Sequence, residues 1–406
     1  MSGEKGSRRK VAMVAPCPFP SVQGSQILIQ DLAGGLERRG HEVHVITYPF
    51  GGSRPIASLR IHRATCPLRY AVDHPGPHLY KPFLDLFVLR ELLRVIRREG
   101  IELLHAHSYE GLLISLLAGR WTSIPVLYHS HTLLEEELPT YFRASWKRAL
   151  AHWVGRLLDR QLPRRSDHCI ALCQRTLRAF RALGVVADRS SCIRPLIFSP
   201  ADKTPSRADV ERHPFVLYAG NLHPYQDIDL LMEGFAEVAS RLPEARLLIT
   251  THSDPSHYAA LARVMGLSGR VSFRVKPPLD EEWRLMRAAD LLVCPRLRCS
   301  GYPIKLLNYL AAGRPILVSE GSAEGIRHGE NGYVVSRPGP KALAEGIIQI
   351  LQSPALAKRL GDGAARTYQE EVVEEHSLSA IEAIYTQCLG EEENAALLAH
   401  PREMAS

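Results

Sequence analysis

The chain has 406 residues, 45% hydrophobic and 23% charged, which favours two soluble domains that each have a core. Its net charge of +7 is compatible with a phosphate-bearing ligand or an anionic membrane, whereas no zinc-finger, bZIP or RRM pattern indicates nucleic acid. No apolar run reaches the length of a membrane span, no signal peptide is evident, and the eight cysteines are scattered, so we expect a cytoplasmic protein with free thiols.

The first part of the chain alternates strand and helix patterns. Val11–Ala15 is predicted to be a buried strand, a helix pattern ends at Gly40, and His41–Tyr48 is predicted to be the second strand. Ligands of such parallel sheets bind at the carboxyl ends of the strands. Gly24 lies in the loop after the first strand, but the G-x-G-x-x-G fingerprint of NAD or FAD sites is absent. Residues 50–80 predict an irregular excursion rich in Gly, Pro and His.

Four histidines lie at the ends of two later predicted strands: His105, His107, His129 and His131. A doubly wound sheet can bring such strand ends together, which makes a metal site one interpretation. No nearby spacing matches a known metal site such as H-E-x-x-H. We therefore favour a polar lining of an active site and expect no metal ion.

The segment Arg143–Arg165 is strongly basic and contains a single acid, Asp159. Tryptophans and leucines recur on or near one face of its predicted helix. A basic helix with such a face is typical of an interfacial membrane helix, so an anionic membrane surface is a candidate partner. The alternative is an amphipathic helix that packs on its own domain and keeps its basic side in solvent.

The polar segment Arg194–Pro214, which is studded with prolines, predicts a domain linker. A second series of strand patterns follows it, separated by helix patterns, and this order predicts a second parallel sheet. The predicted strands are Phe215–Tyr218, Ala245–Thr251, Arg270–Val275 and Asp290–Pro295, and the last predicted helices are Lys341–Leu351, Pro354–Gln369 and Ser377–Leu389.

The segment from Asp290 to Val335 predicts a strand, a loop, a helix over Ile304–Ala312 and another strand. Gly301 in the loop permits a close approach to the backbone, and Pro303 suits the first turn of the helix. Lys305 is unfavourable to the helix dipole in that first turn, whereas the free N–H groups there attract anions. Lys305 and Asn308 could thus hold a diphosphate and its ribose, or they are a surface lysine and an ordinary polar residue.

This segment, SGYPIKLLNYLAAGRPILVSEGSAEGIRHGENGYVV, resembles the donor-binding segment of glycosyltransferase family 4 enzymes. PSVQGSQILIQDLAGGLERRGHEVHVIT, HAHSYEG and SDHCIALCQRTLRAFRALGV also resemble parts of that family. The resemblance implies an α/β protein of the GT-B fold, with two Rossmann-like parallel-sheet domains that face each other across a cleft. We place the domains at residues 1–195 and 196–374, with a last helix at 375–390 that packs back onto the first domain.

The resemblance also implies a retaining transferase that needs no cofactor and no metal. Its donor would be a nucleotide-diphosphate sugar, and its acceptor a glycan, a lipid or a small molecule. His107 would face the donor sugar, with His131 as a second candidate, and Lys305 would act beside the leaving diphosphate. The implied donor-binding residues are Gly24, Gly220, Asn221, Gln226, Lys276, Ser300, Gly301, Tyr302, Pro303, Ile304, Asn308 and Glu324.

The sequence departs from the family at four charged positions. The usual two glutamates of the donor segment correspond to Ser300 and Asn308, and the usual arginine and lysine after the second domain's first strand correspond to Asn221 and Gln226. These losses leave the local charge unchanged, so an active enzyme that relies on Lys305 is the interpretation we favour. The alternatives are a non-catalytic GT-B protein that acts at a membrane or as a scaffold, and a sugar-nucleotide epimerase of the same fold.

Overall fold

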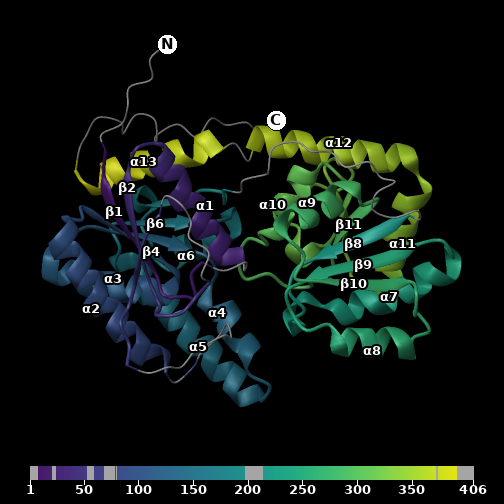
Figure 1. Ribbon diagram of the computed structural model, residues 1–406, viewed down its shortest axis with the longest axis horizontal. Helices are drawn as coiled ribbons and strands as arrows, with labels where there is room; N and C mark the ends of the chain where they lie inside the picture. Colours follow the sequence, from purple (N-terminus) through teal and green to yellow (C-terminus); the bar gives the residue numbers. More distant parts are fainter. Residues whose placement is uncertain are drawn as a thin grey trace, which may run out of the picture. The chain divides into compact units, whose positions relative to one another are not determined.

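The computed structural model describes residues 8–20, 24–52, 59–67, 78, 80–196, 214–371 and 374–390. By their contacts these residues form two units. The first comprises those of Met1–Ile197, Ser300–Tyr302 and Glu374–Ser406, and the second those of Phe198–Cys299 and Pro303–Val373. Each unit is built on a sheet of parallel strands with helices against it (Figure 1). Residues 197–213 of the predicted linker Arg194–Pro214 lie outside the described residues, and the predicted boundary at 195/196 lies at their edge.

The sheet of the first unit has the strand order β3-β2-β1-β4-β5-β6-β7, and all of its pairings are parallel. Its strands are β1 Lys10–Ala15, β2 Glu42–Thr47, β3 Arg60–Arg63, β4 Leu103–His107, β5 Val126–Ser130, β6 His168–Ala171 and β7 Ser190–Cys192. The strand order reverses between β1 and β4, which is where ligands of open parallel sheets bind. The edge strand β3 lies inside the segment that we predicted to be irregular. The sequence did not predict this strand because its half-exposed residues lack an apolar pattern.

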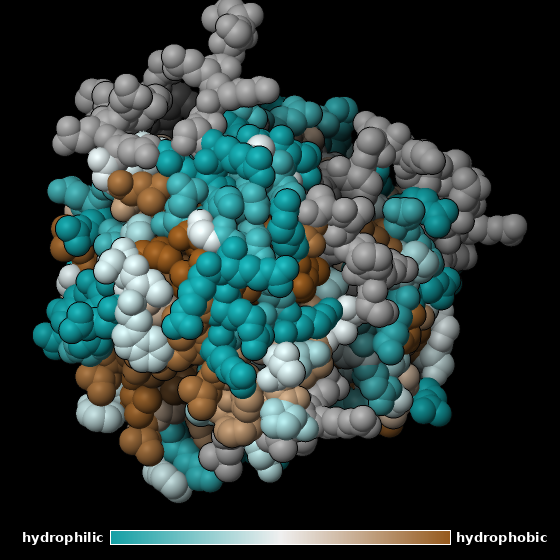
Figure 2. Space-filling model, turned by 60° about the vertical axis from the view of Figure 1, so that its left-hand side comes forward, coloured by the Kyte–Doolittle hydropathy of each residue, from teal (hydrophilic) through white to brown (hydrophobic). Residues whose placement is uncertain are grey.

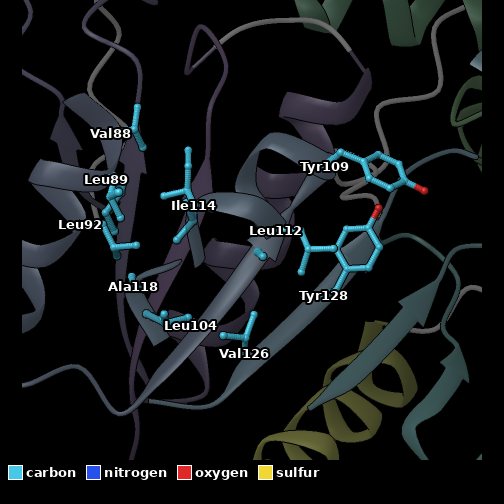
Figure 3. Close-up of a cluster of buried hydrophobic side chains, with 14 of the residues drawn as sticks. Val88, Leu89, Leu92, Leu104, Tyr109, Leu112, Ile114, Ala118, Val126 and Tyr128 are labelled. Carbon is cyan, nitrogen blue, oxygen red and sulfur yellow. The ribbon is translucent and has the colours of Figure 1, made fainter. Parts of the chain in front are cut away.

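Helices cover both faces of this sheet. They are α1 Gly24–Arg38, α2 Lys81–Glu99, α3 Ser108–Thr122, α4 Leu134–Glu137, α5 Ser145–Gln161, α6 Gln174–Ala182 and α13 Glu374–Cys388, with 3-10 turns at Leu138–Tyr141, Pro163–Arg165 and Ala187–Arg189. On one face, α2 packs on β1, β2 and β3, and α3 packs on β1, β4 and β5; their side chains join one apolar cluster (Figure 3). The labelled side chains of that cluster are Val88, Leu89, Leu92, Leu104, Tyr109, Leu112, Ile114, Ala118, Val126 and Tyr128.

The opposite face of the same sheet packs against α1 and α13. Because side chains alternate along a strand, Leu104 of β4 faces α2 and α3 whereas its neighbour Leu103 faces the other way. Leu103 belongs to a core that includes Ile381 and Tyr385 of α13. The Arg39 guanidinium also donates to the Glu382 carboxylate of α13 at 2.9 Å. The last described helix is therefore part of the first unit's core.

A half-buried carboxyl group on α2 leads to a pH prediction. The hydroxyl of Tyr48 donates to Asp85 Oδ1 at 2.8 Å. Burial raises the pKa of Asp85 from its ordinary 3.8 to about 7. Between those pH values the folded protein keeps a proton that the unfolded chain has lost, so the free energy of unfolding falls as the pH rises.

Asp85→Asn keeps an acceptor for Tyr48 and has no proton to lose. We therefore expect this variant to gain stability relative to the unmodified chain as the pH rises from about 4 to about 7. Urea unfolding across that pH range measures the difference. A constant difference between the two proteins at every pH would contradict the predicted titration of Asp85.

The second unit contains a smaller parallel sheet with the strand order β10-β9-β8-β11-β12-β13. Its strands are β8 Phe215–Ala219, β9 Arg246–Thr251, β10 Val271–Val275, β11 Leu291–Cys294, β12 Ile316–Ser319 and β13 Tyr333–Val335. Its helices are α7 Ile228–Arg241, α8 Ser256–Val264, α9 Leu279–Ala288, α10 Lys305–Ala312, α11 Pro340–Gln352 and α12 Pro354–Glu371, with 3-10 turns at Pro224–Gln226 and Glu320–Ser322. The order again reverses beside the first strand, between β8 and β11.

Helix α5 presents its aromatic residues to solvent. Trp146 is 65% exposed and Trp153 is 62% exposed, whereas the helix is buried through Ala151, Gly155 and Asp159. The buried side of α5 is therefore a narrow stripe of short side chains. The packing alternative requires the tryptophan face to be buried instead. Figure 2 brings the α2 side of the first unit forward and shows apolar patches beside hydrophilic surface. Within the described ranges, no helix combines the length and the apolar character needed to cross a membrane.

Candidate functional site

The second unit has a lysine at the carboxyl ends of its central strands. Lys305 is the first residue of α10, and its ammonium group donates to Tyr218 Oη and to Gln226 Oε1, each at 2.8 Å. The same ammonium group lies 4.0 Å from the centre of the Tyr218 ring, which is a cation–π distance. In the described part of the chain, no carboxylate lies within ion-pair distance of Lys305. This cation is therefore held by neutral groups.

Gly220 leaves the space that the Lys305 side chain occupies. A Cβ atom at this position would lie 2.8 Å from Lys305 Nζ and 3.1 Å from the Tyr218 hydroxyl. The backbone of Gly220 also has a φ of 149°, which L-residues rarely adopt. The predicted site residues Gly220, Gln226 and Lys305 thus meet at one place, because the loop after β8 folds over the start of α10.

The surroundings of Lys305 favour the binding of an anion to its ammonium group. Burial lowers the pKa of its ammonium group to about 8, because the charged form has lost part of its hydration. Burial also raises the pKa of the nearby Glu282 carboxyl group. An anionic ligand would restore the favourable interactions that the ammonium group lost with water.

Arg296 is a second cation at this end of the sheet, and the sequence interpretation overlooked it. It follows the end of β11 by two residues, and its guanidinium group lies 4.8 Å from the centre of the Tyr225 ring. The Tyr225 hydroxyl accepts a hydrogen bond from Asn221 Nδ2 at 3.0 Å. The predicted residue Asn221 therefore holds the ring on which Arg296 rests. A basic residue directly after a parallel strand was the signal that could have identified it.

The other residues predicted in this region occupy separate positions. Asn308 is half-buried on α10, Glu324 lies in the loop after β12, and Lys276 directly follows β10 with a φ of 51°. Pro303 precedes the helix instead of entering its first turn, as does Ile304. The reason is local, since the Pro303 carbonyl accepts a turn hydrogen bond from the Leu306 amide at 2.8 Å.

The predicted residues Ser300, Gly301 and Tyr302 group with the first unit. There Gly301 forms an isolated bridge with Thr132, and the Leu133 amide donates to the Ser300 carbonyl at 3.0 Å. A Cβ atom at Gly301 would lie 2.1 Å from the His131 carbonyl oxygen. The close approach that Gly301 permits in this structure is therefore to the chain's own backbone.

The predicted histidines of the first unit lie on or directly after β4 and β5, next to the point between β1 and β4 where the strand order reverses. His107 and His129 are direct neighbours on β4 and β5, and His105 lies on the same face two residues earlier. The closest nitrogen pairs are His105 Nε2 with His129 Nδ1 at 3.1 Å and His107 Nδ1 with His131 Nε2 at 3.2 Å. Gly24 is the exposed first residue of α1. The sheet therefore gathers all four predicted histidines.

Burial keeps these imidazoles neutral at physiological pH. It lowers the pKa of His105 to about 3 and that of His131 to about 4. The same cause holds the pKa of His107 and His129 well below the ordinary value of 6.5. A neutral imidazole at His107 can exchange hydrogen bonds with a hydroxyl group, but it cannot supply a positive charge.

Comparisons with known proteins agree with this architecture. The model of Glycosyltransferase Family 4 matches residues 22–198, and that of Glycosyl transferases group 1 matches residues 213–353. The chain is 24% identical over 404 residues to phosphatidyl-myo-inositol mannosyltransferase of Mycobacterium tuberculosis, which covers 92% of this chain and 97% of the relative.

Two solved structures share the fold. Sucrose-phosphate synthase from Thermosynechococcus elongatus aligns with a TM-score of 0.79 at 20% identity, over 94% of this chain and 100% of that one. Anabaena HepE, solved in complex with UDP-glucose, aligns with a TM-score of 0.72 at 16% identity, over 93% of this chain and 99% of that one. The predicted α/β class with two Rossmann-like parallel sheets is confirmed. The chain belongs to the family 4 glycosyltransferases and has the GT-B fold.

Proposed function

We propose that this chain transfers a sugar from a nucleotide-diphosphate sugar to a lipid or glycan acceptor at the cytoplasmic face of a membrane. The transfer retains the anomeric configuration and uses no metal ion, as the family resemblance implies. The observation that carries the proposal is the Lys305 ammonium group, which lies at the carboxyl end of a parallel sheet and lacks a carboxylate partner among the described residues.

Departure of the nucleotide is the step that this site is suited to assist. Negative charge builds on the diphosphate as the bond to the sugar breaks, and a fixed cation in a partly dry site stabilises that charge. Lys305 is the first such cation and Arg296 the second. Together they replace the two charges that Asn221 and Gln226 lack, which favours an active enzyme over the non-catalytic alternative.

The remaining predicted residues bind and orient the donor. Asn308 offers its amide to the ribose hydroxyls, and Gly24 admits the diphosphate close to the backbone. The neutral imidazole of His107 positions a sugar hydroxyl without competing for the leaving group's charge. Retention then follows when the acceptor hydroxyl attacks from the face that the nucleotide leaves.

A thermal-shift screen with UDP, GDP and ADP and their sugars tests the proposal. We expect one nucleotide series to raise the melting temperature, because a ligand that binds only the folded protein stabilises it. Transfer assays with that donor and the anomeric configuration of the product, read by NMR, then test the reaction. If no nucleotide shifts the melting temperature, the non-catalytic interpretation prevails. If the donor is converted without any acceptor, an epimerase is indicated.

The exposed face of α5 supports a membrane-bound acceptor. Trp146, Leu150, Trp153 and Leu157 are each more than two-fifths exposed, and basic residues lie between them. Aromatic side chains beside basic ones bind the boundary between anionic headgroups and acyl chains. The name of the mannosyltransferase relative also specifies a phosphatidyl-inositol lipid.

The double variant Trp146→Ser/Trp153→Ser is expected to lose most of the binding to vesicles that contain anionic lipid. Both side chains are exposed, so the free energy of unfolding is expected to change little, by about 0.5 kcal/mol or less for each site. Co-sedimentation with vesicles at low and high salt measures the effect. Trp121→Ser is the matched control, because Trp121 is 63% exposed on α3. Equal loss in the control would exclude α5 as the specific membrane surface.

A further inference from the structure

Three of the clustered histidines converge closely enough to share a ligand. One ring nitrogen from each of His105, His107 and His129 lies within 4.8 Å of the other two. His105 and His107 come from β4 and His129 from β5, so a rigid parallel pairing holds their backbones. All three residues are buried, with exposed fractions of 0%, 0% and 3%.

The hydrogen bonds of this cluster leave nitrogen atoms unused. Within the described structure, His107 Nε2 and His129 Nε2 are both buried and have no hydrogen-bond partner. A buried polar atom without a partner has lost its hydration with no hydrogen bond in return, so such atoms call for an explanation. Two unpartnered imidazole nitrogens in one cluster are suited to a metal ion.

A second observation concerns the outer partner of His105. Its Nδ1 atom lies 2.8 Å from the hydroxyl group of Tyr385, and the planes of the two rings are 88° apart. Metal-binding histidines usually engage an oxygen atom through the other ring nitrogen, which sets the orientation of the ring. Tyr385 therefore directs His105 Nε2 toward the cluster, where it now contacts His129 Nδ1.

We propose that His105, His107 and His129 bind a divalent transition-metal ion of the Zn²⁺ class. Zinc bonds to histidine nitrogen are about 2.0–2.1 Å long, so tetrahedral ligand atoms lie about 3.3 Å apart. The three nitrogens lie within 4.8 Å of one another, but the rings are now stacked at interplanar angles of 14°, 13° and 28°. The side chains must therefore rotate about their torsions to point three nitrogens at one ion. A fourth position remains for water or another ligand. His131, whose Nδ1 atom is also buried without a partner, lies beside the site.

The metal ion takes no part in the transfer chemistry, to which we assign no metal, although His107 belongs to both sites. One consequence rests on the proposed function: a metal ion on His107 would compete with the donor sugar for that imidazole. Metal binding itself does not depend on that function and can be measured without a donor. The outcome for the metal site therefore stays separate from the outcome for the transferase.

The direct test uses the full chain without an affinity tag. We expect one equivalent of Zn²⁺ to bind in competition with a chromophoric chelator, after long equilibration because the site is buried. Zinc-edge X-ray absorption of the loaded protein should show about three imidazole ligands, and Co²⁺ should give the visible bands of a tetrahedral site. Absence of a stoichiometric site, or a spectrum with fewer than two imidazoles, would overturn the proposal.

Variants locate the site. His129→Gln is expected to weaken Zn²⁺ binding more than a hundredfold, and Tyr385→Phe to weaken it about 10–100-fold, since it removes only the outer partner. The matched control is His44→Gln, because Glu42, His44 and Glu99 form another group that could hold a metal. Unchanged affinity in His129→Gln, or loss confined to His44→Gln, would contradict the assignment. Circular dichroism checks that each variant is folded. If a variant does not fold, the X-ray absorption and Co²⁺ spectra of the unmodified chain test the metal site instead.

Discussion

Replacing Lys305 with methionine is expected to lower the rate of sugar transfer by about a hundredfold or more, because a fixed donor to the developing charge is lost. Methionine keeps an unbranched side chain of similar length, so the loss of the charge and its hydrogen bonds dominates. The two 2.8 Å bonds to Tyr218 and Gln226 show that the ammonium group is held in place before any ligand arrives. Steady-state kinetics with the donor that the thermal-shift screen identifies measure the effect.

Two further variants make the Lys305 experiment specific. Gly220→Ala should impair transfer in the same way, because its Cβ would occupy space 2.8 Å from Lys305 Nζ. Lys358→Met is the control, since Lys358 is exposed and pairs with Asp362 at 2.6 Å on α12. It should leave the kinetics unchanged. Normal turnover in Lys305→Met with every active donor would remove Lys305 from the mechanism.

Replacing Asp159 with alanine is expected to lower the free energy of unfolding by about 3 kcal/mol, because each buried donor left without its acceptor costs about 1–3 kcal/mol. The carboxylate is fully buried on α5 and accepts the backbone amides of Leu134 and Glu135 at 3.1 and 2.9 Å. It also accepts the hydroxyl group of Tyr109. Asp159→Ala would leave one buried donor and two part-buried donors without this acceptor. Urea unfolding followed by circular dichroism measures the loss.

Hydrogen exchange can assign the Asp159 effect to its contacts. The amides of Leu134 and Glu135 should exchange faster in Asp159→Ala, because they begin α4 and lose their acceptor. Asp362→Ala is the matched control, since its carboxylate is 51% exposed and the change should alter stability by about 0.5 kcal/mol or less. A similar small loss in Asp159→Ala would mean that water replaces the carboxylate at α4.

The strand and helix patterns predicted the two sheets well, because buried parallel strands must be apolar on both faces. β8 and β11 in the second unit show this: their residues are all buried, and each run is bounded by polar or turn residues. Short edge strands were missed for the same reason. β7, Ser190–Cys192, pairs along one side only and is half-exposed, so nothing in its composition separates it from a loop.

The candidate sites were only partly accessible to sequence reading. Lys305 could be identified because its place at a helix start conflicts with the helix dipole, and that conflict is visible in one segment. Arg296 was missed because its role depends on Tyr225, which lies on a loop 71 positions earlier in the chain. The orientation of α5 was also open, since its sequence pattern fits two faces. The structure shows that the helix is buried through Ala151, Gly155 and Asp159, and a Cβ at Gly155 would lie 2.6 Å from Leu134.

Local periodicity and loop chemistry by themselves determined that the chain alternates strands and helices around parallel sheets, with glycines and a lysine after particular strands. Those features follow from interactions between neighbours in sequence. Only the tertiary structure decided which of these residues meet. It placed Gln226 and Gly220 around Lys305, and it brought His105 and His129 together on adjacent strands. Strand order and the packing of loops set such meetings, and neither is encoded in the spacing of any single segment.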